Sequence, residues 1–488
     1  MIISIYGITI YIILLFVISA FFIKKALNSY EEYSFCGRSL KITYILFTYL
    51  GTWIGGGTII GLTSWAYLSG VSKYWIISVP YIVGFPFAIL FITRIRKLNR
   101  YGIADMLALR YPKYKEIIRI PASIGIIIRN VTMVGMQFSA LAYLITLVFG
   151  IQRELSILMI FLVIVSYTTI SGLWGVVITD VFQGILQTVG LILLLYFSIS
   201  LSGGLDNAFE YYQTIDKEEF LSLANFDNWW NQIGVYSVSL GFFFLVGDQG
   251  DWQRIYSSKT NKIAFWGFFV PLLVTLIWML IPAYIGVFQR VPLLTEVDSE
   301  YATYKFILEM LNPRMASFIL ISLFAAIMSS ADSFLLSTGF TFTNDIIKKF
   351  INKEANDKEL IFWNRFFIVI SGGIGFAFAI NIENIINLWM TGIMISSSII
   401  LVPYLLAWFS KRVTTAGAIS GMSAAGIYSL GCLLIVDTIN IKIFWVGILI
   451  NLMFSLSISF FTEKEDRKII EKTYYWSESF KNIKNIPR

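Results

Sequence analysis

The sequence contains no histidine and only two cysteines, Cys36 and Cys432, among its 488 residues. Without imidazoles or clustered thiolates, the chain has no ligand set for a zinc site and no histidine for acid–base catalysis. The phosphate-binding GxxxxGK[ST] loop, the H-E-x-x-H motif and the G-x-S-x-G motif are also missing from the sequence. We therefore expect neither an enzyme nor an ATP-driven pump, and no cofactor.

Charge is scarce as well. Only 14% of the residues are charged, against about 25% in soluble globular proteins. Hydrophobic residues make up 57% of the chain, and the mean hydropathy is +0.74. This composition indicates a polytopic membrane protein surrounded by lipid. The net charge of +7 does not indicate nucleic acid, because the basic residues gather in loops on one side of the expected membrane.

Apolar segments of about 20 residues, each long enough to cross a membrane, recur along the chain. They lie at about 3–23, 44–67, 75–93, 120–148, 155–173, 183–201, 231–248, 264–288, 315–343, 362–381, 386–409, 417–436 and 442–461. The sequence thus predicts an all-α polytopic membrane protein with about 13 transmembrane helices. The first segment has no basic region before it, so we expect a membrane helix and not a cleaved signal peptide.

The basic residues also predict the orientation. If the N-terminus is outside, the inner loops contain 29 of the 37 Lys and Arg residues. The positive-inside rule therefore predicts an outer N-terminus and a cytoplasmic C-terminus, in the cell membrane.

Residues 320–345, ILISLFAAIMSSADSFLLSTGFTFTND, place hydroxyl groups inside an apolar helix. Helical spacing puts five of the small residues on one face, with Asp332 beside them: Ala326, Ser329, Ser330, Ser333 and Ser337. Weakly charged oxygen ligands suit a small monovalent cation, so this face predicts a sodium site. The alternative is close packing between helices, which Ser and Ala also allow.

Glycines interrupt two apolar segments that are five segments apart. GTWIGGG (51–57) lies in the middle of the second, and Gly241, Gly247 and Gly250 mark the seventh. Glycine-interrupted helices at matching places in two halves are typical of transporters built from inverted repeats, with the substrate site at the breaks. A tight packing face is the alternative for the first glycine cluster.

Six stretches, in order, resemble the sodium:solute symporter family between about residues 34 and 430. They are FCGRSL (35–40), YGIADMLALRYP (101–112), SGLWGVVITDVFQG (171–184), GDQGDWQRIYSSK (247–259), FAAIMSSADSFLLS (324–337) and KRVTTAGAISG (411–421). Trp408 departs from the small aliphatic residue usual before the last stretch. The resemblance implies the leucine-transporter fold, a five-plus-five inverted repeat with flanking helices, and uptake of a solute coupled to sodium entry by alternating access.

On this basis we expect four parts. They are a peripheral helix and loop (1–40), a transport core (41–409, with repeats at 41–201 and 231–409), two peripheral helices (410–461) and a cytoplasmic tail (462–488).

The resemblance also implies ion ligands. A sodium ion would lie between the break in the first core helix and the Ser-Ser helix, bound by carbonyl groups of Gly51, Ile54 and Ala326 and the hydroxyls of Ser329 and Ser330. Some relatives bind a second sodium through an aspartate that matches Asp180, and Asp332 or Ser333 would complete that site. The alternative for Asp180 is a solvated residue at a helix end, and the number of sodium ions stays open.

For the solute, the local match is closest to the choline transporter branch, where an aromatic cage holds a quaternary ammonium group. Trp53 matches one cage tryptophan, but Asp248 stands where the branch has a second, and Met133 and Tyr81 lie near the remaining positions. The cage is thus incomplete, and Asp248-Gln249 looks more like the sugar and inositol members. The substrate candidates are Trp53, Thr58, Tyr81, Gln137, Asp248, Gln249 and Trp389.

Arg129 and the Gln253-Arg254 pair are expected to lie away from the solute. Arg129 would reach from the fourth segment to the cytoplasmic surface, with contact to the solute as the alternative. Gln253 and Arg254 would tie an inner loop to lipid or to carboxylates.

Together these features predict a sodium-coupled secondary active symporter for a small organic solute. Its partners would be the solute, sodium as the coupling ion and membrane lipid, without nucleic acid. Proton coupling and a transporter-derived solute sensor are the alternatives. Choline-like cations, sugars or polyols, and amino or carboxylic acids stay open as solutes, as do the monomer and the dimer.

Overall fold

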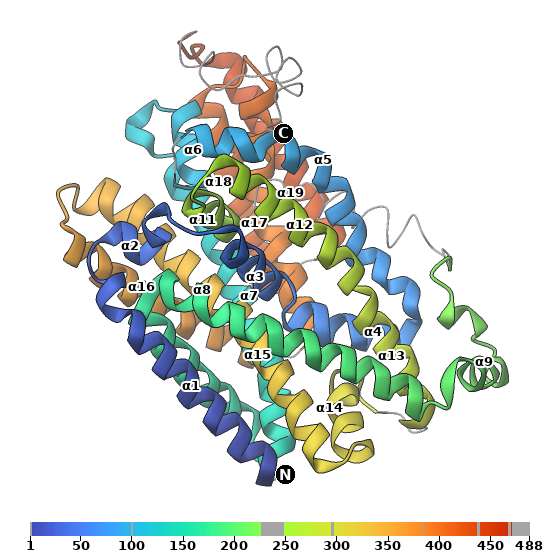
Figure 1. Ribbon diagram of the computed structural model, residues 1–488. Helices are drawn as coiled ribbons and strands as arrows, with labels where there is room; N and C mark the ends of the chain where they lie inside the picture. The colour runs from blue at the N-terminus through green and yellow to red at the C-terminus, as the bar shows by residue number, and fades with distance from the viewer. Residues whose placement is uncertain are drawn as a thin grey trace.

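The computed structural model describes residues 2–98, 101–225, 248–293, 297–382, 384–436, 440–466 and 470. Within these ranges the chain is almost wholly helical, and a single isolated bridge, between Leu40 and Ser258, is its only β-type pairing. The helices pack side by side into one bundle (Figure 1). The prediction of an all-α membrane protein is therefore confirmed.

The helices, in chain order, are α1 (Ile2–Ala26), α2 (Tyr30–Phe35), α3 (Ile42–Trp53), η2 (Gly57–Gly61), α4 (Leu62–Ser69), α5 (Tyr74–Leu98), α6 (Ile103–Arg110), α7 (Arg119–Phe149), α8 (Arg153–Leu201), α9 (Gly204–Thr214), α11 (Gln249–Ser257), α12 (Asn261–Trp278), α13 (Leu280–Leu293), α14 (Ser299–Met310), α15 (Pro313–Thr341), η7 (Phe342–Ile351), α16 (Asp357–Asn381), α17 (Ile385–Phe409), α18 (Thr415–Val436) and α19 (Ile441–Phe461). Short 3₁₀ turns connect several of them.

The predicted count of 13 spans is not confirmed. Among the described residues, nine helices are long and apolar enough to cross a membrane, or ten if the bent pair of α3 with η2 and α4 is one span. Two predicted segments, 155–173 and 183–201, run together as α8 and are separated only by a kink at Gly172, whose φ is +56°. Glycine adopts this left-handed conformation without steric cost. The predicted segment 231–248 lies almost wholly outside the described residues.

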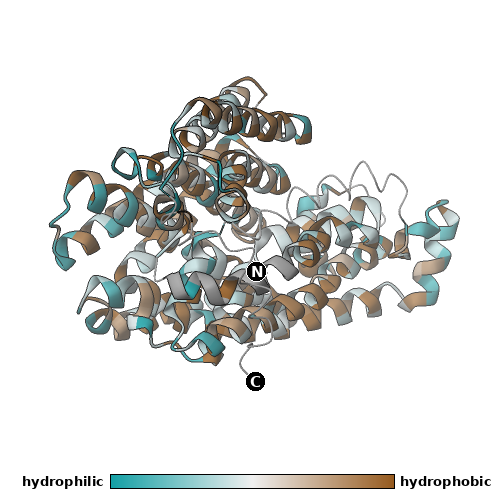
Figure 2. Cartoon of the chain, turned by 90° about the horizontal axis from the view of Figure 1, so that it is seen from above, coloured by the Kyte–Doolittle hydropathy of each residue, from teal (hydrophilic) through white to brown (hydrophobic). Residues whose placement is uncertain are grey.

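Burial separates central from peripheral helices. In the most apolar window of each helix, 94% of the residues are buried in the spans containing α15 and α17, against 22% in α1 and 28% in α18. Figure 2 shows hydrophobic residues along the long helices and hydrophilic residues gathered at helix ends and loops. Helices that satisfy their own backbone and expose apolar side chains suit a lipid environment. The chain is an integral membrane protein.

The GTWIGGG segment is a break in the first core helix. α3 ends at Trp53, the chain leaves helical geometry at Ile54 and Gly55, and η2 with α4 continues at an angle of 51°. A Cβ at Gly55 would collide with the hydroxyl of Ser330 on α15 and lie 3.0 Å from Nε2 of Gln137 on α7. The glycine thus allows the broken backbone to approach both helices, and the predicted interruption of this helix is confirmed.

The centre of the bundle is α15, which packs against α8, α7, α3 and α16. The short helix α11 also contacts α15. Asp248 caps its N-terminus, because Asp248 Oδ1 accepts hydrogen bonds from the N–H groups of Gly250 (2.7 Å) and Asp251 (3.3 Å). The predicted second interruption falls partly outside the described residues, because Gly241 and Gly247 are not among them. Thus α15, the broken α3 and the start of α11 surround the sites described next.

Candidate functional site

A cluster of neutral oxygens lies where the broken helix meets α15. Ser329 Oγ donates to the carbonyl oxygens of Gly51 and Ala326, each at 2.9 Å. Ser330 Oγ lies 3.0 Å from the carbonyl oxygens of both Gly51 and Thr52. We call this cluster the neutral-oxygen niche, and all its residues are buried.

The niche brings together most of the predicted sodium ligands: Gly51, Ala326, Ser329 and Ser330. Ile54 lies in the break itself, as the residue that caps α3, and its N–H bonds to Leu50 O at 3.1 Å. The carbonyl of Thr52, which faces Ser330, was not among the sequence candidates. The sequence did hold a clue to Thr52, because it lies just before the interrupted turn, where the last carbonyl groups of a helix lack hydrogen-bond partners within the helix.

Two buried carboxylates lie beside the niche. Asp180 of α8 accepts a hydrogen bond from Thr48 Oγ1, and Asp332 of α15 accepts one from the Tyr167 hydroxyl at 2.5 Å. A Cβ at Gly51 would lie 3.4 Å from Ser329 Oγ and 3.5 Å from Asp180 Oδ1, so Asp180 reaches the edge of the niche. The alternative of Asp180 as a solvated helix-end residue is wrong, because its side chain is fully buried.

Arg254 of α11 lies within this polar network. Its guanidinium donates to Thr48 Oγ1 at 3.1 Å, to Ser333 Oγ at 2.8 Å and to Thr52 Oγ1. The expectation that Arg254 ties an inner loop to lipid is therefore wrong, because the side chain links α11 to hydroxyls on α3 and α15 deep in the bundle. Ser333, a candidate ligand of a second sodium, already accepts from this guanidinium.

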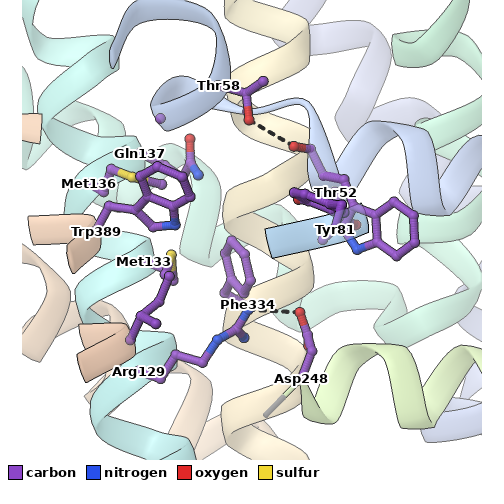
Figure 3. A pocket seen from close by; sticks show the side chains of 14 residues that line it. Thr52, Thr58, Tyr81, Arg129, Met133, Met136, Gln137, Asp248, Phe334 and Trp389 are labelled. Atoms are coloured by element: carbon purple, nitrogen blue, oxygen red, sulfur yellow. Dashed lines mark hydrogen bonds and ion pairs between the residues drawn. The ribbon is translucent and has the colours of Figure 1, made fainter. Parts of the chain in front are cut away.

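A cavity of about 40 Å³ lies on the other side of the break. It is lined by Thr52, Trp53, Gly55, Gly57, Thr58, Tyr81, Arg129, Met133, Met136, Gln137, Asp248, Phe334, Trp389 and Ile393. In Figure 3, Trp389, Met136 and Gln137 face Thr52 and Tyr81 across it. Because a water molecule needs roughly 10–15 Å³ of such space, a few waters fit here. An organic solute requires the walls to separate.

The cavity unites most of the predicted substrate residues: Trp53, Thr58, Tyr81, Gln137, Asp248 and Trp389. Gln249 is not among its walls. Its Oε1 accepts from Ile103 N at 3.2 Å and its Nε2 donates to Tyr101 O at 3.0 Å, so it holds the start of α6. Gln249 is the first residue of α11, and its side chain points away from the cavity, towards Tyr101 and Ile103. The structure therefore removes Gln249 from the substrate candidates.

Two of these residues also stabilise the break. Gln137 Oε1 accepts from Gly56 N at 2.7 Å, and Thr58 Oγ1 donates to Trp53 O at 2.9 Å. Backbone groups that lose their helical partners are costly when buried, and these two side chains replace the lost bonds. Trp53 itself packs against Tyr49, Tyr81 and Phe268, with ring centroids 4.9 to 5.9 Å apart.

Arg129 is the largest correction to the sequence interpretation. The prediction that it reaches to the cytoplasmic surface is wrong, because it is 4% exposed and lines the cavity. Its Nη2 lies 2.8 Å from Asp248 Oδ2, and its guanidinium carbon lies 5.2 Å from the Phe334 ring centroid (Figure 3). A signal was available, since Arg129 stands four residues before Met133 and eight before Gln137, on the same helix face.

The profile described as "Sodium:solute symporter family" matches residues 33–425. The chain is 26% identical over 428 residues to the high-affinity choline transporter 1 of Drosophila melanogaster, covering 82% of this chain and 65% of the relative. It is 26% identical over 440 residues to the sodium/pantothenate symporter of Escherichia coli (strain K12), covering 86% and 88%. The chain thus spans about two thirds of the length of the choline transporters it matches.

Among solved structures, a substrate-bound, outward-open Na⁺-coupled sialic acid symporter superposes with a TM-score of 0.78 over 95% of this chain and 99% of the other. The sequence identity is 18%, so this likeness shows the fold, which is the leucine-transporter fold. The relatives are transporters and not enzymes. Because the family profile covers most of its length, the chain belongs to the sodium:solute symporter family.

Proposed function

We propose that this protein is a sodium-coupled symporter that takes up a small organic solute across the plasma membrane by alternating access. One observation carries the proposal: the neutral-oxygen niche and the cavity share the break in the first core helix. Thr52 lines the cavity while its carbonyl oxygen faces Ser330 of the niche. A cation and a solute that contact the same broken segment influence each other's affinity, and this influence is reciprocal.

The niche supports sodium as the coupling ion. Its groups are the carbonyls of Gly51, Thr52 and Ala326 and the hydroxyls of Ser329 and Ser330, which carry no net charge, and we propose that the carbonyl of Ile54 in the adjoining break joins them. Such oxygens can replace the hydration shell of a monovalent cation and still release it. The serine hydroxyls now lie within hydrogen-bond distance of the carbonyl oxygens of Gly51, Thr52 and Ala326, and a bound cation would replace the hydroxyls as the partner of those oxygens.

A second cation is proposed between Asp180 and Asp332. In the part of the chain that the structure describes, Oδ1 of each carboxylate is buried without a hydrogen-bond donor. Because the hydroxyl of Ser333 already accepts a hydrogen bond from Arg254, we expect the two carboxylates to contribute more to the binding of the second cation than this serine does. Buried carboxylates also bind protons, so these residues favour proton coupling as the second candidate.

The cavity supports the solute site, with Trp53, Thr58, Tyr81, Gln137, Asp248 and Trp389 as proposed contacts. Aromatic walls with few polar groups are typical of small-molecule sites. We further propose that the N-terminus is outside and the C-terminus cytoplasmic, as the basic loops predict.

Uptake by purified protein in proteoliposomes tests the proposal, with pantothenate and choline as labelled probes. An inward sodium gradient should drive accumulation of at least one probe, and a potassium gradient of equal size should not. Accumulation driven by an inward proton gradient without sodium would support the second candidate and contradict sodium coupling. Failure of every gradient to accumulate pantothenate, choline or any member of a panel of sugars, polyols, amino acids and carboxylic acids would contradict the function itself.

A further inference from the structure

We propose that the solute is a monocarboxylate whose carboxylate binds Arg129. This inference rests on the proposed symport function and assigns a substrate class to the same cavity. The cavity contains one cation and one anion, Arg129 and Asp248, whose side chains are 5% and 6% exposed. Its remaining walls are aromatic, aliphatic, thioether, hydroxyl, amide or glycine. The charge that the site accepts therefore depends on this pair.

Asp248 is already occupied by donors. Its Oδ1 accepts from the N–H groups of Gly250 and Asp251, at the N-terminus of α11, and its Oδ2 accepts from Arg129. A carboxylate that caps a helix is stabilised by the positive end of the helix dipole. An ammonium group placed at Asp248 would lie beside the Arg129 guanidinium, which repels it. The site is therefore poorly suited to a choline-like solute.

Arg129 is suited to a second carboxylate. A guanidinium has five N–H donors in a planar fork that matches a carboxylate in two-point geometry. One terminal nitrogen of Arg129 bonds to Asp248 and the other lies 3.0 Å from Asn130 Oδ1. Exchanging the neutral amide oxygen for a carboxylate keeps the bond to Asp248 and adds a charged partner.

The rest of the cavity describes the body of the solute. Trp389, Met133, Met136 and Phe334 provide apolar surface, and Thr58 and Gln137 add hydroxyl and amide groups near the break. An organic acid with an apolar or hydroxylated body fits these walls.

Thermal stability of the purified full-length protein tests this inference, in sodium and in potassium chloride. The probes are three acids with their matched alcohols, namely pantothenate with pantothenol, gluconate with sorbitol and phenylacetate with 2-phenylethanol, and choline. We expect at least one acid to stabilise the protein in sodium while its alcohol and choline do not. Stabilisation by choline or by an alcohol equal to that by the acids overturns the inference, as does the failure of all three acids.

The two proposals fail in different ways. Sodium-dependent stabilisation by choline would keep the symport function and end the carboxylate assignment. Equal stabilisation by an acid in sodium and potassium would keep the assignment and contradict sodium coupling.

Substitutions of Arg129 and of Asp248 should change the affinity for the acid in opposite directions. Arg129→Gln should weaken binding of the acid about 10–150-fold, the loss expected for a charge-assisted pair. Arg129→Lys keeps the positive charge but not the planar guanidinium, so its affinity for the acid should fall less. Asp248→Asn keeps a helix-capping side chain and removes the negative charge that competes for Arg129, so acid binding should become tighter. Weaker binding in Asp248→Asn with unchanged binding in Arg129→Gln would overturn the inference.

Two further variants keep the test decisive. Arg129→Gln leaves Asp248 without its partner, and if it fails to fold, Arg129→Gln with Asp248→Asn replaces the pair by neutral side chains of similar shape and should show the same loss. The matched control is Arg153→Gln, because Arg153 bonds to Ser139 Oγ at 3.0 Å and Ala379 O at 2.8 Å, outside the cavity walls. It should leave acid binding unchanged.

Discussion

The neutral-oxygen niche and the Arg129–Asp248 pair lie on two sides of one helix break, yet they differ in chemistry. The niche joins Ser329 and Ser330 to backbone carbonyl oxygens and contains no formal charge. The cavity contains a buried ion pair at 2.8 Å. Neutral oxygens distinguish cations by size and hydration, whereas a buried pair distinguishes solutes by charge. The comparison teaches that ion selection and solute selection are separable in this protein, although both depend on one broken segment.

The largest effect is expected from the niche itself. Ser329→Ala combined with Ser330→Ala removes two hydroxyl ligands and should raise the sodium concentration for half-maximal uptake roughly 100-fold. At saturating sodium, the solute concentration for half-maximal uptake should change little.

The control for this variant is Ser322→Ala, on the same helix, because the hydroxyl of Ser322 bonds only to Phe318 O within α15 among the described contacts. It should leave the sodium requirement unchanged. An unaltered sodium dependence in the double variant would show that the niche is not the ion site.

The break should transmit a perturbation to both sites. Gly55→Ala forces a Cβ against Ser330 and towards Gln137, so uptake should lose about tenfold in apparent affinity for sodium and for solute together. Gly431→Ala, at a helical glycine with no heavy atom within 4 Å of the added Cβ, is the matched control and should be neutral. A loss confined to one ligand would mean that the two sites do not share the break.

A smaller effect is expected from the aromatic wall. Trp389→Ala should weaken solute binding several-fold through lost apolar contact, with sodium binding unchanged. Isothermal titration of each ligand checks both values. A change in sodium affinity of similar size would contradict the separation of the two sites.

The smallest effect is expected from an acid outside both sites. Glu300 of α14 is buried, and burial raises the pKa of its carboxyl above the usual 4.5, although hydrogen bonds from Tyr143 and from Ile385 N oppose the shift. The folded protein therefore keeps this proton to a higher pH than the unfolded chain. Its contribution to stability is present below about pH 4.5 and is lost as pH rises through the folded pKa.

Glu300→Gln should remove that pH dependence. Between pH 4 and pH 7, the loss of melting temperature should be smaller in the variant, by no more than a few degrees for a chain of this size. Sodium and solute affinities should stay at native values. Equal pH dependence in both proteins would contradict the burial effect.

The sequence allowed the broken helix and the serine face to be predicted, because both are local patterns within a few turns. GTWIGGG leaves too few side chains to hold a helix, and Ser329 and Ser330 share a face by spacing alone. The predicted membrane spans were less accurate, since only tertiary packing decides whether a glycine such as Gly172 kinks a helix or ends it.

The charged pair could not be predicted in the same way. Arg129 and Asp248 are 119 residues apart, and their meeting depends on how deeply α7 enters the bundle and on where α11 begins. An isolated arginine near a helix end more commonly reaches to the surface. Gln249 was misplaced for the same reason, because one residue of register at the start of α11 turns its side chain towards Tyr101 and Ile103.

Direct binding of radioactive sodium to the purified protein tests the central claim that the neutral-oxygen niche holds the coupling ion. Saturable binding should be the same in the native protein and in Arg129→Gln, and Ser329→Ala with Ser330→Ala should lose the sodium ion of the niche, so that fewer ions bind per protein. Undiminished binding in the double serine variant would contradict the account.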